Sequence, residues 1–330
     1  MPVISIRYHA SLNEVQEDHA ILPLLTAPLA PSPFDRLAWF RALESDGHRP
    51  LFAIAQQGAD LAILPLALTP EGLGPLANWY AFTVRPLTNA PHLLPALARA
   101  LKARAPRLTL APLPNEAQEA TQLAAAFRKA GWFTTLTPCD TNHYLTLNGR
   151  TFAQYLATRP GPLRTTLKRK AKKVTIALHD HFTPAAWGHY EAVYAQSWKP
   201  EEGSPALLRR FAQEESAAGR LRLGLAYADE TPVAAQLWTV EGGTAYIHKL
   251  AYAESAKPLS PGTTLSAALF ERVIDTDRVT TIDFGTGDDP YKRDWMESQR
   301  PRYRLTAHRL SAPGQWPAIA KALLKRLLHR

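Results

Sequence analysis

The sequence predicts an α/β (α+β) protein of two domains, with mixed, mostly antiparallel sheets flanked by helices. Three observations predict this fold class. The chain has 330 residues, which is long for one average domain and suits two. Strand and helix patterns alternate in the first half. In the second half, three strand-like segments follow one another with only two short turns between them, as in an antiparallel meander.

The first half divides into short elements. Residues 34–45 place Leu37, Phe40 and Leu43 at helical spacing, and Phe34-Asp35 can open that helix. Residues 50–68 read as two strands around a Gln-Gly-Ala-Asp turn. The expected elements that follow are an amphipathic helix in 93–106, a strand in 107–113 and a helix in 118–132, which Gly131 ends.

Aromatic residues gather in 74–86, where Trp79, Tyr80 and Phe82 lie close together in the sequence. Two interpretations stay open: core aromatics under a loop, or a wall against a ligand. We therefore keep Trp79 and Tyr80 as candidate substrate-binding residues.

A domain boundary is expected near Asn148-Gly149, which is a turn signal, and Thr151 can cap the helix that follows. The predicted domains are residues 1–148 and 149–330. The elements expected in the second are helices over 184–198 and 205–218, strands over 220–227, 232–240 and 244–252, a helix over 263–275, a strand over 279–284, a short helix near 290–297 and a strand over 302–310.

Composition excludes several classes of protein. Apolar content of 46% and charged content of 20% are those of a globular chain, not a disordered one. No apolar run is long enough for a membrane span, and the first residues lack the pattern of a secretory signal, so we expect a cytoplasmic protein. A single cysteine, Cys139, excludes an internal disulfide and a cysteine-based metal site. The close histidine pair at 179–181 lacks further ligands, and no metal is expected.

The positive charge lies in the second half. Residues 1–148 hold 11 Lys/Arg against 11 Asp/Glu, whereas residues 149–330 hold 27 against 18. A basic surface attracts anions such as phosphates, RNA, an acidic carrier protein or a membrane face. Residues 159–174 contain seven basic residues and no acid, with apolar residues at helical spacing, so they form either a solvated basic helix or an anion-binding one. The amphipathic C-terminal segment 316–330 either docks onto its domain or contacts a membrane or a carrier protein.

The segment 257–269 has the features of an anion site. Pro261-Gly262 forms a tight turn, and Thr263 and Thr264 begin a helix. Helix N-termini favour negative charge, yet no carboxylate occurs between Ala256 and Phe270, which leaves backbone donors for an external anion such as a pyrophosphate. The alternative is that Ser260 or Thr263 simply caps the helix. Lys257 stands beside this turn.

A second group of polar residues follows the strand at 279–284. The segment "DFGTGDDPYKRDW" places Asp283, Asp288, Asp289, Tyr291 and Lys292 at the carboxyl end of that strand. Aspartates before a proline are also common turn and N-cap residues, so some of this group is explained by the turn alone.

Together these motifs resemble the GNAT acyltransferases. The segments "PVAAQLWTV", "IHKLAY", "SPGTTL" and "DFGTGDDPYKRDW" are similar to the CelD/BcsL-type branch, which is related to the FemABX transferases. The likeness covers about 187–310 and extends more weakly through "SPFDRLAWF" and "PLANWYAF". It departs from the usual phosphate-loop pattern, because only Gly262 of that loop is glycine. The resemblance implies two GNAT-like domains in tandem, the second one catalytic and the first one substrate-shaping.

The resemblance also implies roles for these residues. Acetyl-CoA or another acyl-CoA would lie between strands 244–252 and 279–284, its pantetheine arm along Lys249 and Leu250. Its pyrophosphate would lie at Lys257, Ser260, Pro261, Gly262, Thr263 and Thr264. Tyr291 corresponds to the tyrosine that GNAT enzymes use as general acid, and Lys292 resembles a FemABX lysine that stabilises negative charge. Asp283, Asp288 and His248 are candidate bases, since a histidine titrates near neutral pH, and Asp289 is a candidate for binding the amine.

The sequence therefore predicts an acyl-CoA-dependent N-acyltransferase, most simply an N-acetyltransferase. Its acceptor would be an amine on a small molecule, a sugar or a cell-envelope precursor. One alternative takes the acyl group from an aminoacyl-tRNA or an acyl carrier protein, anions that a basic surface attracts. Another is a binding module that kept the fold and lost turnover. DNA is not an expected partner.

Overall fold

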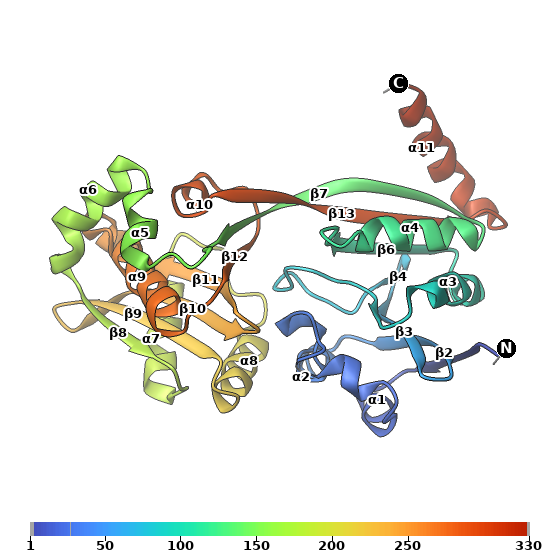
Figure 1. Ribbon diagram of the computed structural model, residues 1–330, viewed down its shortest axis with the longest axis horizontal. Helices are drawn as coiled ribbons and strands as arrows, with labels where there is room; N and C mark the ends of the chain where they lie inside the picture. Colours follow the sequence, from blue (N-terminus) through green and yellow to red (C-terminus); the bar gives the residue numbers. More distant parts are fainter. Residues whose placement is uncertain (1–2, 27, 329–330) are drawn as a thin grey trace. The chain divides into compact units, whose positions relative to one another are not determined.

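The computed structural model describes residues 3–26 and 28–328, which form two compact units. Unit 1 comprises residues up to 140 together with those from 301 onward, and unit 2 comprises 141–300. Figure 1 shows the chain passing from blue to teal in unit 1, through green and orange in unit 2, and returning in red with β13 and α11. These boundaries differ from the expected 1–148 and 149–330. The reason is that β13 pairs with β6 over Tyr303–His308, which adds the last segment to unit 1.

Unit 1 contains a mixed sheet in the order β1-β2-β3-β4-β6-β13, with β5 paired to β3. Neighbours are antiparallel except β4 and β6, which are parallel. Its elements are β1 (Ser5–His9), α1 (Leu12–Glu17), α2 (Leu37–Ser45), β2 (Pro50–Gln57), β3 (Asp60–Thr69), β4 (Gly72–Pro75), β5 (Leu87–Thr88), α3 (Leu94–Leu101), β6 (Arg107–Leu113), α4 (Glu119–Lys129), the start of β7 (Trp132–Thr146), most of β13 (Ser298–Arg309), and α11 (Trp316–Leu328).

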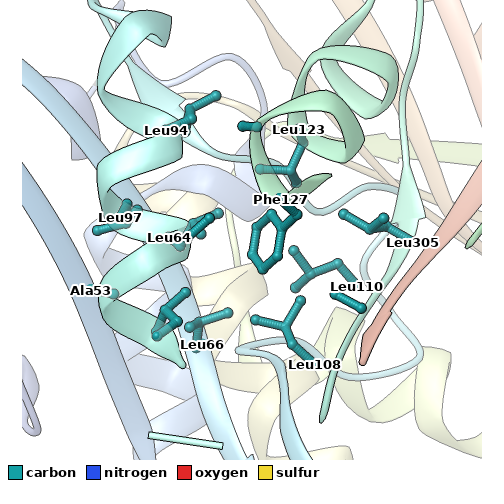
Figure 2. Close-up of a cluster of buried hydrophobic side chains, with 14 of the residues drawn as sticks. Ala53, Leu64, Leu66, Leu94, Leu97, Leu108, Leu110, Leu123, Phe127 and Leu305 are labelled. Atoms are coloured by element: carbon teal, nitrogen blue, oxygen red, sulfur yellow. The ribbon is translucent and has the colours of Figure 1, made fainter. Parts of the chain in front are cut away.

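The core of unit 1 lies between α3, α4 and the sheet. Figure 2 shows Leu94, Leu97, Leu123 and Phe127 of the two helices pointing at side chains of the strands, among them Leu64. Burial of each such side chain contributes roughly 1.5–3 kcal/mol, so this cluster is the main stabilising feature of the unit.

The strands of unit 2 follow one another in the order β7-β12-β11-β10-β9-β8. Only β11 and β12 are parallel neighbours. Its elements are α5 (Phe152–Ala157), α6 (Gly161–Lys170), β8 (Thr175–His179), α7 (Pro184–Ala195), α8 (Pro205–Ala217), β9 (Leu221–Ala228), β10 (Thr231–Glu241), β11 (Thr244–Tyr252), α9 (Pro261–Glu271), β12 (Thr281–Thr286) and α10 (Pro290–Trp295). Helices α7 and α9 both pack against β9, β10 and β11. The predicted fold class and the three-strand meander are confirmed.

Two irregularities of β11 decide where its side chains point. The register with β10 passes from Lys249 opposite Leu237 to Ile247 opposite Trp238, so His248 is the extra residue of a β-bulge. The parallel pairing with β12 covers only Thr244–Tyr246 opposite Thr281–Asp283, whereas β11 runs on to Tyr252. Past Tyr246 the two strands therefore separate, and the edge of β11 no longer follows β12.

Local signals in the sequence account for several element boundaries. The Thr151 hydroxyl accepts a hydrogen bond from Gln154 N in a complete capping box, and the Thr183 hydroxyl caps α7 by accepting from Ala186 N. Gly131 follows α4 with φ +80°, as expected for a C′ glycine.

The C-terminal segment 316–328 does form a helix, α11. Among the side chains of α11 that the structure describes, Ile319 is buried, while Leu323, Leu324, Leu327 and Leu328 are exposed. Docking is therefore limited to Ile319, and contact of α11 with a membrane or a carrier protein stays a prediction. None of the helices within the described residues combines the length and hydropathy that crossing a bilayer requires.

Candidate functional site

A cavity of about 270 Å³ lies in unit 2 where α9 begins. It brings together Leu250 of β11, the turn before α9 and Tyr291 of α10. The other lining residues are Leu163, Trp198, Tyr252, Lys257, Ser260, Pro261, Gly262, Thr263, Ser266, Asp294 and Trp295. Seven of the residues that the sequence predicted thus meet in one place: Leu250, Lys257, Ser260, Pro261, Gly262, Thr263 and Tyr291.

The N-terminus of α9 is open toward an anion. Ser260, the N-cap residue, has left-handed backbone angles (φ 53°, ψ 46°), and its side chain makes no capping hydrogen bond. The first turn of the helix holds no acidic residue. The Ser260 hydroxyl instead accepts a hydrogen bond of 3.0 Å from the ammonium of Lys170, the last residue of α6. A helix N-terminus with a lysine ammonium beside it attracts negative charge.

Buried contacts fix this first turn of α9. Gln236 of β10 is fully buried, and its amide nitrogen donates to Gly262 O at 3.1 Å and to Ser266 Oγ at 2.8 Å. The Thr264 hydroxyl, 7% exposed, donates to Ser260 O at 3.4 Å, so Thr264 supports the turn rather than lining the cavity. A Cβ atom on Gly262 would lie 3.2 Å from Tyr252 Cδ1, which makes this position tight. The turn is therefore held rigidly against β10 and β11.

Tyr291 has the protonation state that a general acid needs. Its ring packs edge-on against Phe284 at 5.7 Å between centroids. Burial raises its pKa above the ordinary value, and the negative charge of Asp289 raises it further. The phenol consequently keeps its proton at neutral pH and can give it to a stronger base that forms in the cavity.

Lys292 lies outside the cavity. Its ammonium donates to Thr286 O at 2.5 Å and to Gly287 O at 3.1 Å, and the side chain is 4% exposed. The Phe284 ring lies 5.3 Å from the ammonium. These contacts hold the turn between β12 and α10, which positions the neighbouring Tyr291.

Asp283 is buried in a network that uses both of its oxygens. Oδ1 accepts from Asn142 Nδ2 at 2.7 Å and from Gly285 N at 2.8 Å, and Oδ2 accepts from Arg300 at 2.8 Å. This network joins the ends of β7, β12 and β13 within unit 2 and leaves the carboxylate with the contacts of a structural residue.

The other two aspartates differ from each other. Asp288 contacts the buried His143 at 2.8 Å and Arg293 at 2.7 Å, and the hydrogen bond from His143 is the main reason that its pKa is lowered. Asp289 is exposed at the start of α10, and its charge acts on both Tyr291 and Lys199. Of the two carboxylates, Asp289 is the one whose charge acts on a residue of the cavity, Tyr291.

His248 and Lys249 lie on the other face of the sheet from Leu250. His248 Nε2 is 2.8 Å from Thr239 Oγ1, and its ring meets Phe211 of α8 at 5.0 Å. Lys249, 6% exposed, donates to Glu202 at 2.9 Å. Because the bulge at His248 inserts one residue, both side chains point to the face that α7 and α8 cover. The ammonium of Lys249 is thus not part of the cavity that Leu250 lines.

Burial lowers the pKa of Lys249 to about 8, although Glu202 opposes this shift. Part of the Lys249 population therefore loses its proton slightly above neutral pH.

Trp79 and Tyr80 belong to unit 1. Trp79 is 57% exposed and Tyr80 is buried, and their rings are 4.3 Å apart. Within the ranges that the structure describes, no group of three or more His, Cys, Asp or Glu side chains is arranged to hold a metal ion.

Sequence reasoning missed Lys170, Trp198 and Gln236. A signal for Lys170 was present, since Leu163, Leu167 and Lys170 follow at i, i+4 and i+7 and so share one face of α6. Trp198 lies in the loop after α7, where no periodicity applies, and its ring contacts that of Tyr252 at a tilt of 42°, with 4.3 Å between centroids. Gln236 sits in an apolar strand pattern that gives no hint of its polar contacts with Gly262, Ser266 and Trp238.

The site combines two parallel strands that separate past Tyr246 with an uncapped helix N-terminus whose first turn holds no acidic residue. Residues 161–293 match the acetyltransferase (GNAT) domain family. This match lies within unit 2 and covers less than half of the chain. Comparison of the sequence with curated proteins gave no match.

Several solved structures share the fold over nearly the whole chain. FemX is 10% identical with a TM-score of 0.63, covering 96% of this chain and all of its own. L-PGS from Bacillus licheniformis is 14% identical with a TM-score of 0.54, covering 86% of this chain and 89% of its own. A tandem GNAT protein from the clavulanic acid biosynthesis pathway is 13% identical with a TM-score of 0.54, covering 92% and 98%. At these identities the likeness establishes the fold, and relates the chain in fold to FemX.

Proposed function

We propose that this protein is an acyl-CoA-dependent N-acyltransferase, most simply an N-acetyltransferase, whose catalytic site lies in unit 2. The observation that carries the proposal is the N-terminus of α9. It has no acidic residue and no side-chain cap, Lys170 and Lys257 lie beside it, and it opens into the same cavity as Tyr291. A pyrophosphate at this terminus would direct the rest of the cofactor along the edge of β11.

The residues of the cavity suit acyl transfer. The amine nitrogen of the acceptor attacks the thioester carbonyl carbon, the C–N bond forms, and the C–S bond breaks. The departing thiolate takes the proton of the Tyr291 phenol, and the attacking amine gives up its proton to a base. In this proposal Lys292 holds the turn that places Tyr291, and Asp289, whose charge acts on Tyr291, is the carboxylate available to bind the acceptor amine.

A second donor class has support from α6. Lys168, Arg169 and Lys170 end this helix, Lys172 and Lys173 follow it, and Lys170 reaches the cavity loop. Such a cluster would attract the phosphates of an aminoacyl-tRNA or the acidic surface of an acyl carrier protein. The acceptor in either case is an amine on a small molecule, a sugar or a cell-envelope precursor.

Thermal unfolding tests the proposal. Acetyl-CoA, longer acyl-CoAs and free CoA at about a hundred times their dissociation constants should each stabilise the protein by about 2.7 kcal/mol. A Gly262→Glu variant places a carboxylate at the helix terminus and should lose this shift. Gly188→Glu is the matched control, since a Cβ on Gly188 meets nothing within 4 Å in another helix of the same unit. If neither CoA nor any acyl-CoA stabilises the wild-type protein against thermal unfolding, the CoA proposal fails. Charged tRNA and acyl carrier protein then become the donors to assay.

A further inference from the structure

A second and larger cavity, of about 490 Å³, lies in unit 2 beside α7. One wall is aromatic: Trp187, Tyr190 and Tyr194 follow at i, i+3 and i+7 and so share one face of the helix. The Trp187 and Tyr190 rings stack at 4.7 Å, and Tyr190 and Tyr194 lie 6.1 Å apart. Pro200, Pro205 and Leu208 close the other side. The cavity can therefore bury an apolar body the size of one or two rings.

The charged residues of the lining are mostly acidic. Glu191, Glu201 and Glu202 line the cavity against a single base, Lys199. This is opposite to the chain as a whole, whose net charge is +9. Glu191 is anchored, because its Oε1 accepts the indole N–H of Trp187 at 2.7 Å. Carboxylates beside aromatic faces form an environment that favours a cation over an anion.

The aromatic wall already faces one ammonium. Lys249 Nζ lies 5.4 Å from the centroid of the Tyr194 ring while it donates to Glu202. Glu202 and the Tyr194 ring attract this ammonium although burial lowers its pKa, and groups of the same kind in the lining can attract the ammonium of a ligand.

This second cavity adjoins the one at α9. Trp198 lines the α9 cavity and its neighbour Lys199 lines the second one. On β11, Leu250 lines the α9 cavity, and Lys249 pairs with Glu202 of the second. A ligand beside α7 would thus be separated from the α9 cavity by one strand and one loop.

We infer that the α7 cavity binds an organic ammonium with an aromatic or apolar body, and that this ligand is the acyl acceptor. The identification of this ligand as the acyl acceptor rests on the proposed function, whereas its binding in the α7 cavity does not. The charge of the lining disfavours phosphorylated sugars and nucleotides, so the inference narrows the acceptor to a hydrophobic amine. The amine is bound as its ammonium, and it must lose one proton before its nitrogen attacks.

Calorimetric titration of the full chain at pH 7, without any CoA, tests the inference. The probes are 2-phenylethylamine, 2-phenylethanol and 3-phenylpropionate, which share one ring and similar length but differ in charge. We expect the amine to bind at least about tenfold more tightly than the alcohol, with no binding of the acid. Equal affinity for amine and alcohol, tighter binding of the acid, or no binding of any probe would each overturn it.

Variants locate the binding. Glu191→Gln removes a charge but retains an oxygen that can accept the Trp187 N–H. This variant should bind the amine about fivefold more weakly and bind the alcohol as the wild type does. Tyr190→Leu should weaken the binding of both the amine and the alcohol. Glu230→Gln, in the turn between β9 and β10, is the matched control and should change neither. An amine affinity unaffected by Glu191→Gln and Tyr190→Leu would place the binding elsewhere and refute the inference.

The two proposals fail separately. If CoA stabilises the protein and no amine binds, the acceptor class is wrong while the proposed function stands. If the amine binds and no CoA has an effect, the cavity is an ammonium site and the acyl-CoA proposal falls.

Discussion

Lys170 offers the sharpest test of the anion site, because its ammonium lies 3.0 Å from Ser260 Oγ at the N-terminus of α9. A phosphate held there would be about 4 Å from this ammonium, which corresponds to about 4 kcal/mol at an effective dielectric constant of 20. Lys170 is half-buried, so screening by solvent and the entropy of its side chain reduce this to about 1–1.5 kcal/mol. Lys170→Ala should therefore raise the dissociation constant of CoA about tenfold.

The assay is a calorimetric titration with CoA and, separately, with pantetheine, which has the same arm without the phosphates. Lys168→Ala is the control, since Lys168 belongs to the same helix but is exposed. We expect Lys170→Ala to weaken the binding of CoA but not that of pantetheine. The loss of affinity for CoA should become smaller as the salt concentration rises. An unchanged dissociation constant for CoA, or an equal loss for pantetheine, would refute the reasoning.

Three further predictions concern the side chains around the cavity. Tyr291→Phe should lower kcat about 10²- to 10⁴-fold in an acyl-transfer assay, with acetyl-CoA binding unchanged, because only the proton donor is lost; a kcat within twofold of wild type would remove Tyr291 as the acid. Lys292→Met should lower the free energy of unfolding by about 1–3 kcal/mol in urea, because the carbonyls of Thr286 and Gly287 lose their donor; unchanged stability with abolished turnover would instead support the oxyanion role. Lys249 has its pKa lowered from 10.5 to about 8, so the unfolded state binds the extra proton between these values and stability rises with pH there. Relative to Lys249→Met, the wild type should gain up to about 3 kcal/mol from pH 8 to pH 10.5; a flat difference would contradict the burial of this ammonium.

Much of unit 2 could be predicted from the sequence because its signals are local. The meander strands are separated by two short turns, and Gly242 and Gly243 both adopt positive φ in the second. The candidate anion site was visible as a helix start without acids. These features depend on neighbours in the chain, which a sequence displays directly.

Contacts between distant residues could not be predicted. Asp283 looked like a candidate base because the sequence does not show that Asn142 and Arg300 bind its carboxylate. Its partner Asn142 is 141 residues away. Likewise, His143 meets Asp288 across 145 residues. The 15-residue β7 mixes exposed and buried positions without strict alternation, so no period marked it as a strand.

The bulge at His248 shows how one residue changes a site. Regular alternation would place Lys249 and His248 on opposite faces of β11. The inserted residue turns both toward α7 and α8. Nothing in "TAYIHKLAY" signals this, because the bulge depends on how β10 and β11 pair.

The central claim is that an acyl-CoA lies along β11 with its phosphates at α9. Hydrogen exchange of the backbone amides with and without saturating acetyl-CoA tests this most directly. We expect slower exchange at 247–252 and 260–264, with β8 unchanged, and no such protection in Gly262→Glu. Unchanged exchange in these two segments, or protection confined to unit 1, would contradict it.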